Sequence, residues 1–480
     1  MRKVGKLKGY LTVYLSLTIG VLLSFVLVVI EGVRMQTVKL EAECVTDMAL
    51  NSIFAEYNRQ LLEQYELFYI DSSYGGESPS YENTEAHIRK YMNMNFEKEV
   101  LGVSFFIKDI TGLRVDNATI EKAAIATDDN GEVLAYQISQ YMKHKMGITT
   151  IENMLQVSQQ LSGWENSDIA SQRASAEETI HSMLEEKNSQ REETEDEITI
   201  NNPADAVNST RTDGIFGAIY PSGKTISGEQ VQLSEYVSYR TLEVGNGLAL
   251  QDTETGVIDQ ALIQQYIFQQ CGYYGSEKEN SKLKYQIEYL LVGKNNDAEN
   301  LKEVLNRLLI IREAANVAYL FSDADKQAQA DAMALSITAS VGMPGLQQAV
   351  KMSIIFAWSY AESVKDMRIL MDGYAVPAVK TNDTWNTPLT QLVSYQSYLG
   401  SYTKTSQGMN YRQYLDALLW ITSTDTRMYR LMDIIEMDIR KTNGNSNFKM
   451  DGCFDCIEAK MNVSSSYGYG YEITRMYSYE

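Results

Sequence analysis

The sequence predicts an α+β fold that is predominantly helical, with a single N-terminal transmembrane helix continuing into a long extracytoplasmic helix. Three observations support this prediction. Only 6 prolines and 30 glycines occur in 480 residues, which favours long regular elements over many short turns. Residues 10–30 form an apolar run without a charged side chain. β-branched and aromatic residues gather in 100–127 and again near the C-terminal end, which predicts a mixed ectodomain with a strand-like C-terminal tail.

The apolar run, YLTVYLSLTIGVLLSFVLVVI, is long enough to cross a bilayer, which requires about 20 apolar residues. The positive-inside rule predicts a cytoplasmic basic segment at 1–9, a transmembrane helix at 10–30 and an extracytoplasmic remainder. The sequence after the run lacks the small-residue pattern of a secretory cleavage site, so a retained single-pass anchor in the cell membrane is favoured over a cleaved signal or a buried helix. The basic residues before the run are Arg2, Lys3, Lys6 and Lys8.

Net charge limits the partners of the chain. Lysine and arginine number 42 against 63 acidic residues, a formal net charge of −21. Nucleic acid requires a basic face, so we expect no nucleic-acid partner, and the lipid bilayer is the one partner that the composition predicts. The 3 histidines leave little for histidine-based catalysis or metal binding.

Residues 31–163 are expected to hold the membrane-proximal long helix and an α/β region. No proline or glycine interrupts 33–70, which predicts one continuous helix there. A helix over 84–98 with Thr84 as its cap follows, and then strands over 100–110 and 113–127. The sequence Asp-Asp-Asn-Gly at 128–131 lacks the carboxylates of a calcium loop at the required spacing and predicts a tight turn before a helical stretch over 132–162.

The second half divides by composition. Residues 164–213 are rich in acidic side chains and predict a flexible linker or insertion. Residues 214–447 predict a mainly helical domain, with Asn296 as an N-cap, and residues 448–480 a tyrosine-rich, strand-like tail. The uncharged run at 332–350 could be a second membrane span, but its Pro and Gly residues favour a buried helix pair joined by a turn at 343–345.

No motif in the sequence predicts a reaction. G-x-S-x-G, H-E-x-x-H and a complete phosphate-binding loop are all missing, and the sequence Gly-Lys-Thr at 223–225 has alanine where that loop needs its first glycine. His87, His144 and His181 lie in separate segments. We therefore predict no catalytic, cofactor-binding or metal-binding residues, no cofactor and no small-molecule substrate.

Cys453 and Cys456 have the C-x-x-C spacing of redox and zinc sites. A zinc site would need a second pair, but Cys44 and Cys271 are isolated in the sequence. The surrounding residues also lack the strand–helix context of a thioredoxin-like site. The pair is expected to be either a disulfide in an oxidised loop or two free thiols.

The N-terminal sequence KLKGYLTVYLSLTIGVLLSFVLVVIEGVR resembles the TadE/TadG-like pseudopilins of tight-adherence (Flp) pilus systems. The resemblance implies a possible processing site between Gly9 and Tyr10. One position departs from the pattern, because Tyr14 stands where such proteins usually carry glutamate. The matching positions are Gly9, Thr12, Val13, Glu31, Gly32 and Arg34.

The wider chain is similar to an uncharacterised membrane-anchored family of Gram-positive bacteria found beside such pilus genes. Stretches at 67–76, 306–323 and 357–373 are among those that carry this likeness. The resemblance implies a structural or assembly component of a Tad/Flp-type pilus or secretion apparatus, in contact with other pilus or secretion proteins and without catalytic activity. The alternatives are a cell-surface adhesin or binding module and an extracellular enzyme acting on the cell wall.

Overall fold

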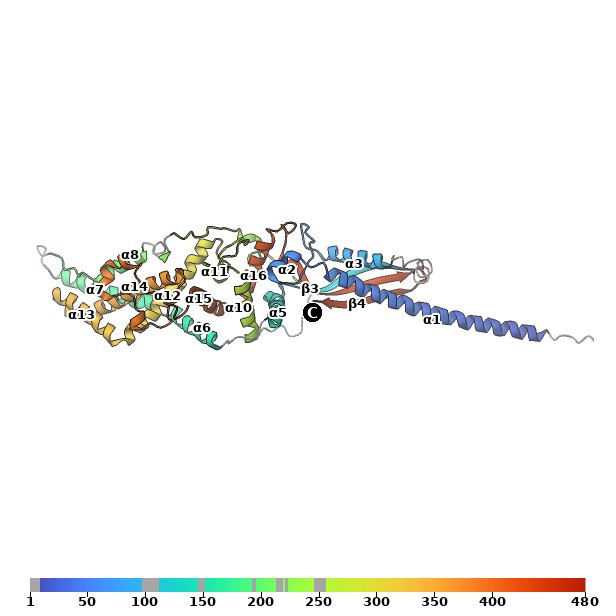
Figure 1. Ribbon diagram of the computed structural model, residues 1–480, viewed down its shortest axis with the longest axis horizontal. Coiled ribbons are helices and arrows are strands. Elements are labelled where there is room, and N and C mark those ends of the chain that lie inside the picture. Colours follow the sequence, from blue (N-terminus) through green and yellow to red (C-terminus); the bar gives the residue numbers. More distant parts are fainter. Residues whose placement is uncertain are drawn as a thin grey trace, which may run out of the picture. The chain divides into compact units, whose positions relative to one another are not determined.

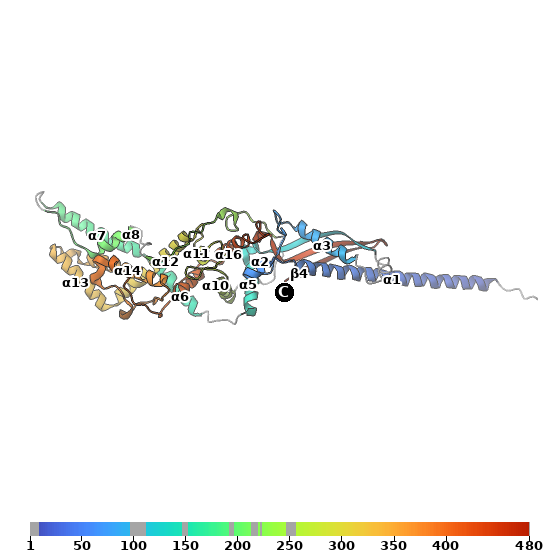
Figure 2. The same ribbon diagram turned by 45° about the horizontal axis from the view of Figure 1, so that its top comes forward.

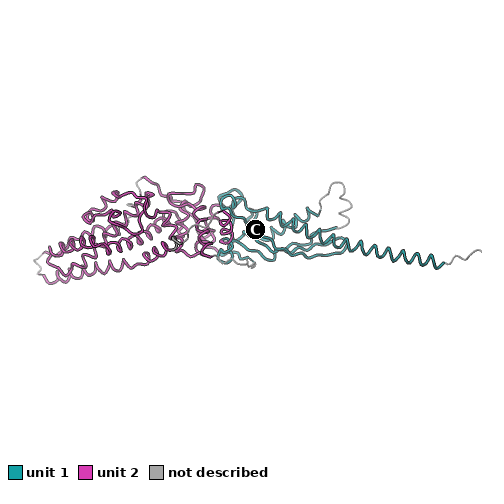
Figure 3. The backbone as a smooth tube through the Cα atoms, turned by 60° about the horizontal axis from the view of Figure 1, so that its bottom comes forward, with its two compact units in different colours: residues 1–134, 241–254, 439–480 teal, residues 135–240, 255–438 magenta. Residues whose placement is uncertain are grey.

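The computed structural model describes residues 9–96, 112–145, 152–191, 196–212, 219–220, 223–245 and 256–479. The chain divides into two compact units (Figure 3). Unit 1 comprises residues 1–134, 241–254 and 439–480, and unit 2 comprises residues 135–240 and 255–438. Most described residues are helical and the one sheet is small, so the predicted α+β, predominantly helical class is confirmed.

Helix α1 (Tyr10–Phe54) is the spine of unit 1 and continues well beyond the sheet (Figures 1 and 2). Its side chains become buried only from Val38 onward. The structure differs from the single helix predicted over 33–70, because α1 ends at Phe54 and α2 (Arg59–Tyr65) begins after Asn58. The Asn58 side chain accepts hydrogen bonds from two backbone N–H groups of α2, and this N-cap starts a new helix without any proline or glycine.

The sheet of unit 1 is antiparallel, with β3 (Cys453–Ser465) at its centre. Strand β2 (Leu113–Ile125) pairs along one side of β3, and β4 (Gly470–Ser478) and the short β1 (Ile70–Asp71) pair along the other. The strand-like tail and the strand expected over 113–127 are confirmed. The strand expected over 100–110 lies outside the described residues.

Two helices cover one face of this sheet, namely the outer part of α1 and α3 (Tyr81–Phe96). Their apolar side chains and those of alternate strand residues form one core, in which Ile53, Ile88 and Met461 are fully buried. The opposite face carries ion pairs such as Lys460–Glu472, as expected for an antiparallel sheet buried on one side only. Thr84 is buried within α3 and does not cap it, because the helix begins three residues earlier than predicted.

The tight turn predicted at 128–131 is confirmed. Asp129, Asn130 and Gly131 all have positive φ angles, at the start of α5 (Asp128–Lys145). Asp128 fixes the turn, since its carboxylate accepts the backbone N–H of Ile125 at 3.0 Å and that of Gly245 at 3.0 Å. The helix expected over 132–162 is described as α5 and α6 (Glu152–Glu165), and the residues between them lie outside the description.

Unit 2 is a bundle of helices. The described helices after α6 are α7 (Ile169–Ser189), α8 (Pro203–Thr212), α10 (Val257–Gln270), α11 (Gln286–Val292), α12 (Asp297–Ser322), α13 (Ala324–Ser340), α14 (Gln347–Met371), α15 (Tyr411–Ile421) and α16 (Thr424–Ile439), with short 3₁₀ segments between some of them. The long helix α14 is central and packs against α7, α8, α12 and α13.

Several predictions within unit 2 can be compared with this bundle. Asn296 caps α12 by accepting the Glu299 N–H at 2.8 Å, as predicted. The run at 332–350 forms the expected helix pair, α13 and α14, joined through Pro344. Residues 164–213 were predicted to be a flexible linker or an insertion, and the structure contradicts the linker because α7 and α8 lie there. Ala176 and Ile180 of α7 are buried, so an acidic composition did not prevent packing.

Candidate functional site: where the apolar helix meets the sheet

The N-terminal part of α1 exposes its apolar side chains. Leu11, Leu22 and Val28 are each more than 60% exposed, and no residue in the most apolar 18-residue stretch of α1 is buried. Among the described residues, α1 is the one helix that is long and apolar enough to cross a membrane. Leaving a leucine or valine side chain in water costs roughly 1.5–3 kcal/mol relative to burying it, so this surface favours an apolar environment.

The serine and threonine hydroxyl groups in this apolar part are satisfied within the helix itself. Ser16, Thr18 and Ser24 each donate a hydrogen bond of 2.9–3.0 Å to a backbone carbonyl three or four residues earlier. A helix in hydrocarbon must pair its polar groups internally. These residues therefore add no unpaired donor to the apolar surface.

Where α1 joins the sheet, alternate side chains along β4 and just beyond its two ends bind α1. We call this set the tyrosine ladder. Four of its five members are tyrosines, and Ile473, at the centre of the series, is buried in the core instead. The pairs are Tyr469 with Glu31, Tyr471 with the Met35 carbonyl at 3.0 Å, Arg475 with Asp47 at 3.2 Å, Tyr477 with Asn51, and Tyr479 with the Phe54 carbonyl at 2.7 Å.

The contacts of the ladder stay in register because β4 with its flanking residues and the facing part of α1 have nearly equal lengths. An α-helix rises 1.5 Å per residue, so α1 advances about 35 Å from Glu31 to Phe54. A strand rises about 3.3 Å per residue, so the chain advances about 33 Å from Tyr469 to Tyr479. The strand and the helix run in the same direction, and every second strand residue therefore meets α1 at a new turn.

The first contacts of the ladder lie beside the end of the apolar run. The Arg34 guanidinium stacks 4.4 Å from the centre of the Tyr467 ring and binds Glu31 at 2.9 Å. Glu31 and Arg34 are the first charged side chains after residues 10–30. The turn between β3 and β4 therefore lies against α1 at the point where its apolar run ends. The alternation of tyrosines in YGYGYEITRMYSY is the sequence signal for this contact.

The predicted processing site lies at the start of α1. Gly9 is the N-cap residue, and its carbonyl accepts the Val13 N–H at 3.3 Å and the Thr12 hydroxyl at 2.7 Å. Tyr10 and Tyr14 are 65% and 67% exposed. Cleavage at this possible processing site, which the pseudopilin resemblance implies, would remove residues 1–9 and leave α1 beginning at Tyr10.

None of the four cysteines forms a disulfide, all four being among the described residues. Cys453 and Cys456 are buried on β3. Residues three apart on a strand lie roughly 10 Å apart with side chains on opposite faces, whereas a disulfide needs α-carbons within about 7 Å. Of the two alternatives, the structure therefore has two thiols and not the disulfide. Burial raises the pKa of the Cys456 thiol to about 11, which makes it a poor nucleophile.

The structure does not gather the histidines into a site. His87 lies 2.8 Å from the Glu56 carboxylate and stacks beside Tyr74. His181 is exposed on α7 near Glu185. Within the described part of the chain, no group of three histidine, cysteine or carboxylate side chains is arranged to hold a metal ion.

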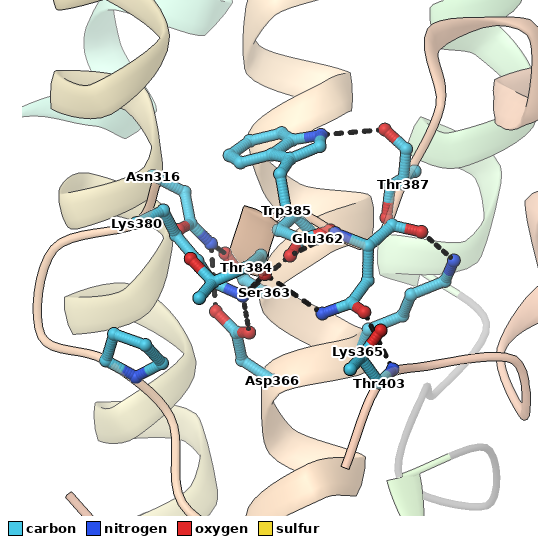
Figure 4. Close-up of polar contacts among 12 residues, drawn as sticks. Asn316, Glu362, Ser363, Lys365, Asp366, Lys380, Thr384, Trp385, Thr387 and Thr403 are labelled. Atoms are coloured by element: carbon cyan, nitrogen blue, oxygen red, sulfur yellow. Dashed lines mark hydrogen bonds and ion pairs between the residues drawn. The ribbon is translucent and has the colours of Figure 1, made fainter. Parts of the chain in front are cut away.

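Unit 2 contains a buried network of charges that the sequence analysis missed (Figure 4). Lys380 lies 2.6 Å from Asp366 and 2.7 Å from Glu362, and Arg312 lies 3.0 Å from Asp366. Burial alone would raise the pKa of Asp366, but the charges of Lys380 and Arg312 outweigh it and hold that pKa below its usual value. Burial would likewise lower the pKa of Lys380, but Asp366 and Glu362 raise it.

This network attaches an irregular segment to the bundle. Glu362 on α14 accepts the backbone N–H of Asn386 at 3.0 Å, and Arg312 on α12 donates to the Pro377 carbonyl at 2.9 Å. Trp358 donates to the Thr387 carbonyl at 2.6 Å. Every charge in the network contacts an opposite charge and is closed to solvent. The network is therefore suited to holding this segment in place and not to binding or converting a substrate.

A second buried carboxylate, Glu288 on α11, is only partly paired. Its Oε1 accepts the Tyr274 N–H at 2.9 Å and the Tyr411 hydroxyl at 2.8 Å. Its Oε2 is buried without a hydrogen-bond partner in the described structure. Burial raises the pKa of Glu288 to about 7, although these hydrogen bonds oppose the shift. Glu288 can therefore change its protonation state near neutral pH.

Unit 2 also has an open groove of about 940 Å³ beside α7 and α8. The residues that line it include the acidic Glu177, Glu185 and Asp205, the basic Arg191 and the apolar Ile180. Burial and the nearby Glu177 charge raise the pKa of Asp205. The groove is acidic and shallow, and its side chains form no catalytic arrangement among the residues described.

Together, these features define a predominantly helical α+β protein with one N-terminal helix of membrane-spanning length clasped by an antiparallel sheet. Residues 191–465 match the model of DUF5702, a family of unknown function. The match covers more than half of the chain, and the protein belongs to this family. No curated protein and no solved structure matches the chain.

Proposed function

We propose that this protein is a single-pass membrane protein with a cytoplasmic N-terminus, and that it serves as a structural or assembly component of a Tad/Flp-type pilus or secretion apparatus. One observation carries the proposal. A single helix, α1, presents an unburied apolar surface along its first part and serves as the spine of a folded sheet along its second part. Such a helix transmits the position of the membrane directly to the folded unit.

Three further observations support this proposal. Basic residues precede the apolar run, which favours a cytoplasmic N-terminus. The sequence around Gly9 and Glu31 resembles that of pseudopilins, which supports the pilus assignment. The buried charges of unit 2 pair with one another, so we expect no catalytic activity from them.

The groove beside α7 and α8 favours a second candidate, an anchored adhesin or binding module. In that case the groove would receive a ligand, and no pilus protein would be needed. An acidic groove selects basic groups, so a cationic peptide is the chemical class that it fits.

Topology can be tested with the cysteines of the native protein. Cys44 is exposed on α1, whereas the other three cysteines are buried. A membrane-impermeant maleimide applied to intact cells should label the wild-type protein and not the Cys44→Ser variant. Labelling that requires cell lysis would contradict the extracytoplasmic placement.

The pilus assignment needs a separate test. Crosslinking in native membranes followed by purification of the full chain should recover a pilus ATPase, platform protein or pilin. A variant with the apolar run 10–30 replaced by that of an unrelated single-pass protein is the matched control. Recovery of none of these partners, with correct topology, would contradict the pilus role and favour the adhesin.

A further inference from the structure

The β3–β4 turn carries a different kind of surface from the rest of its hairpin. Residues 461–471 contain no charged side chain, whereas Lys460 and Glu472 next to them form an ion pair on the open face of the sheet. The uncharged stretch includes Tyr467, which is 42% exposed, and Tyr469. Charged side chains do contact this stretch from the neighbouring strand β2, where Arg114 and Asp116 bind the Ser464 hydroxyl. Within the hairpin, the turn beyond Ser464 is therefore the part with the fewest charged groups to remove from water.

The same turn is fixed at a known height on α1. Residues 10–30 span about 31 Å as a helix, close to the roughly 30 Å hydrocarbon thickness of a bilayer. Glu31 and Arg34 then lie at the level of the lipid headgroups, and these two residues hold Tyr469 and Tyr467. From this level, the β3–β4 hairpin runs along α1 away from the membrane. The turn is therefore the end of the hairpin that lies nearest the membrane.

We propose that the β3–β4 turn, with Tyr467 and Tyr469, rests in the headgroup layer of the membrane beside the exit of α1. Tyrosine suits this layer because its ring is apolar and its hydroxyl remains hydrated, and it is enriched at membrane interfaces for that reason. This inference rests on the proposed anchor. It adds a second contact with the lipid surface, and two contacts fix the tilt of unit 1 where a helix alone would allow it to swing.

The test measures membrane depth with spin labels on the full chain in liposomes of phosphatidylcholine and phosphatidylglycerol. Cys44→Ser removes the exposed native thiol, and single cysteines are then placed at three exposed positions. Ser466→Cys labels the turn while keeping both tyrosines. Leu23→Cys reports the anchor, and Met476→Cys is a matched control on the outer part of β4.

Collisions with lipid-soluble oxygen and with a water-soluble nickel chelate give the depth of each label. We expect the label at 23 to be deep, the label at 466 to show a several-fold lower nickel accessibility than the label at 476, and Tyr467→Ser to raise the accessibility at 466. If 466 and 476 are equally accessible while 23 is deep, the turn does not touch the membrane and the anchor stands. If 23 is also aqueous, the anchor itself is overturned.

Discussion

Lys380 is a buried lysine that lies between the carboxylates of Asp366 and Glu362. Removing one partner of a buried ion pair leaves an uncompensated charge and typically costs about 3–5 kcal/mol. We expect Lys380→Met to lower the free energy of unfolding of unit 2 by about that amount. All four tryptophans lie in unit 2, so urea unfolding followed by tryptophan fluorescence measures this unit.

The matched control for this variant is Lys143→Met. Lys143 pairs with Asp259 at 2.8 Å in the same unit, but its side chain is 44% exposed. An exposed pair contributes at most about 1 kcal/mol. Equal effects of the two substitutions would mean that the network does not stabilise the bundle.

The buried carboxyl group of Glu288 should make the free energy of unfolding of unit 2 depend on pH. Its folded-state pKa is raised from 4.5 to about 7, so the folded protein binds its proton more tightly than the unfolded chain does. The resulting stability is fully present below about pH 4.5 and is lost as the pH rises through 7. Glu288→Gln keeps a neutral side chain throughout. We therefore expect the variant to gain on the order of 3 kcal/mol over wild type between pH 4.5 and 8.

Urea unfolding of both proteins across this pH range measures the difference. Glu279→Gln, which alters an exposed carboxylate in the same unit, should follow the wild-type curve. Parallel curves for Glu288→Gln and wild type would contradict a raised pKa at Glu288.

At the scale of elements, the tyrosine ladder depends on the two-residue period of β4. Inserting one alanine between Ile473 and Thr474 turns Arg475, Tyr477 and Tyr479 to the opposite face of the sheet. We expect the outer part of α1 to lose packing against β4, seen as faster hydrogen exchange of its amides at 42–54. One alanine inserted after Gly468, in the turn, should leave exchange unchanged because turns tolerate insertions. Equal exchange in both variants would show that the ladder does not hold α1.

The elements that the sequence predicted are those with a local cause. The apolar run of α1, the Asn296 cap and the alternating strands are each determined by neighbouring residues. The break after Phe54 was missed because its cause, the Asn58 cap, counts for little beside an uninterrupted helical pattern. The alternating tyrosines of the ladder are visible in the sequence, but their partners on α1 could not be predicted from it, since Tyr469 and Glu31 lie 438 residues apart. The charge network was missed for the same reason, because Lys380 gives no local sign of meeting Asp366.

At the scale of the whole molecule, the units do not follow chain order. Segment 439–480 folds with the N-terminal residues in unit 1, whereas composition had divided the chain into consecutive segments. Changes in composition along the chain cannot reveal that these distant segments fold together. Strand β2 lies in the first part of the sequence, whereas its partner β3 and the next strand β4 lie near the C-terminal end. Unit 1 therefore becomes complete only when the C-terminal tail has been made.

The mature N-terminus determines whether the protein is a permanent membrane anchor or a processed pseudopilin. Cleavage after Gly9 would leave a charged amino group on Tyr10 at the start of an apolar helix, where an unpaired charge is costly. A glutamate at position 14 could pair with it, but this chain has Tyr14. We therefore expect mass spectrometry of the protein from native membranes to find residues 1–9 retained. Tyr14→Glu should favour a start at Tyr10 in the presence of a prepilin peptidase, whereas Tyr14→Phe should not. A wild-type start at Tyr10 would contradict the permanent anchor and indicate a pseudopilin that can leave the bilayer.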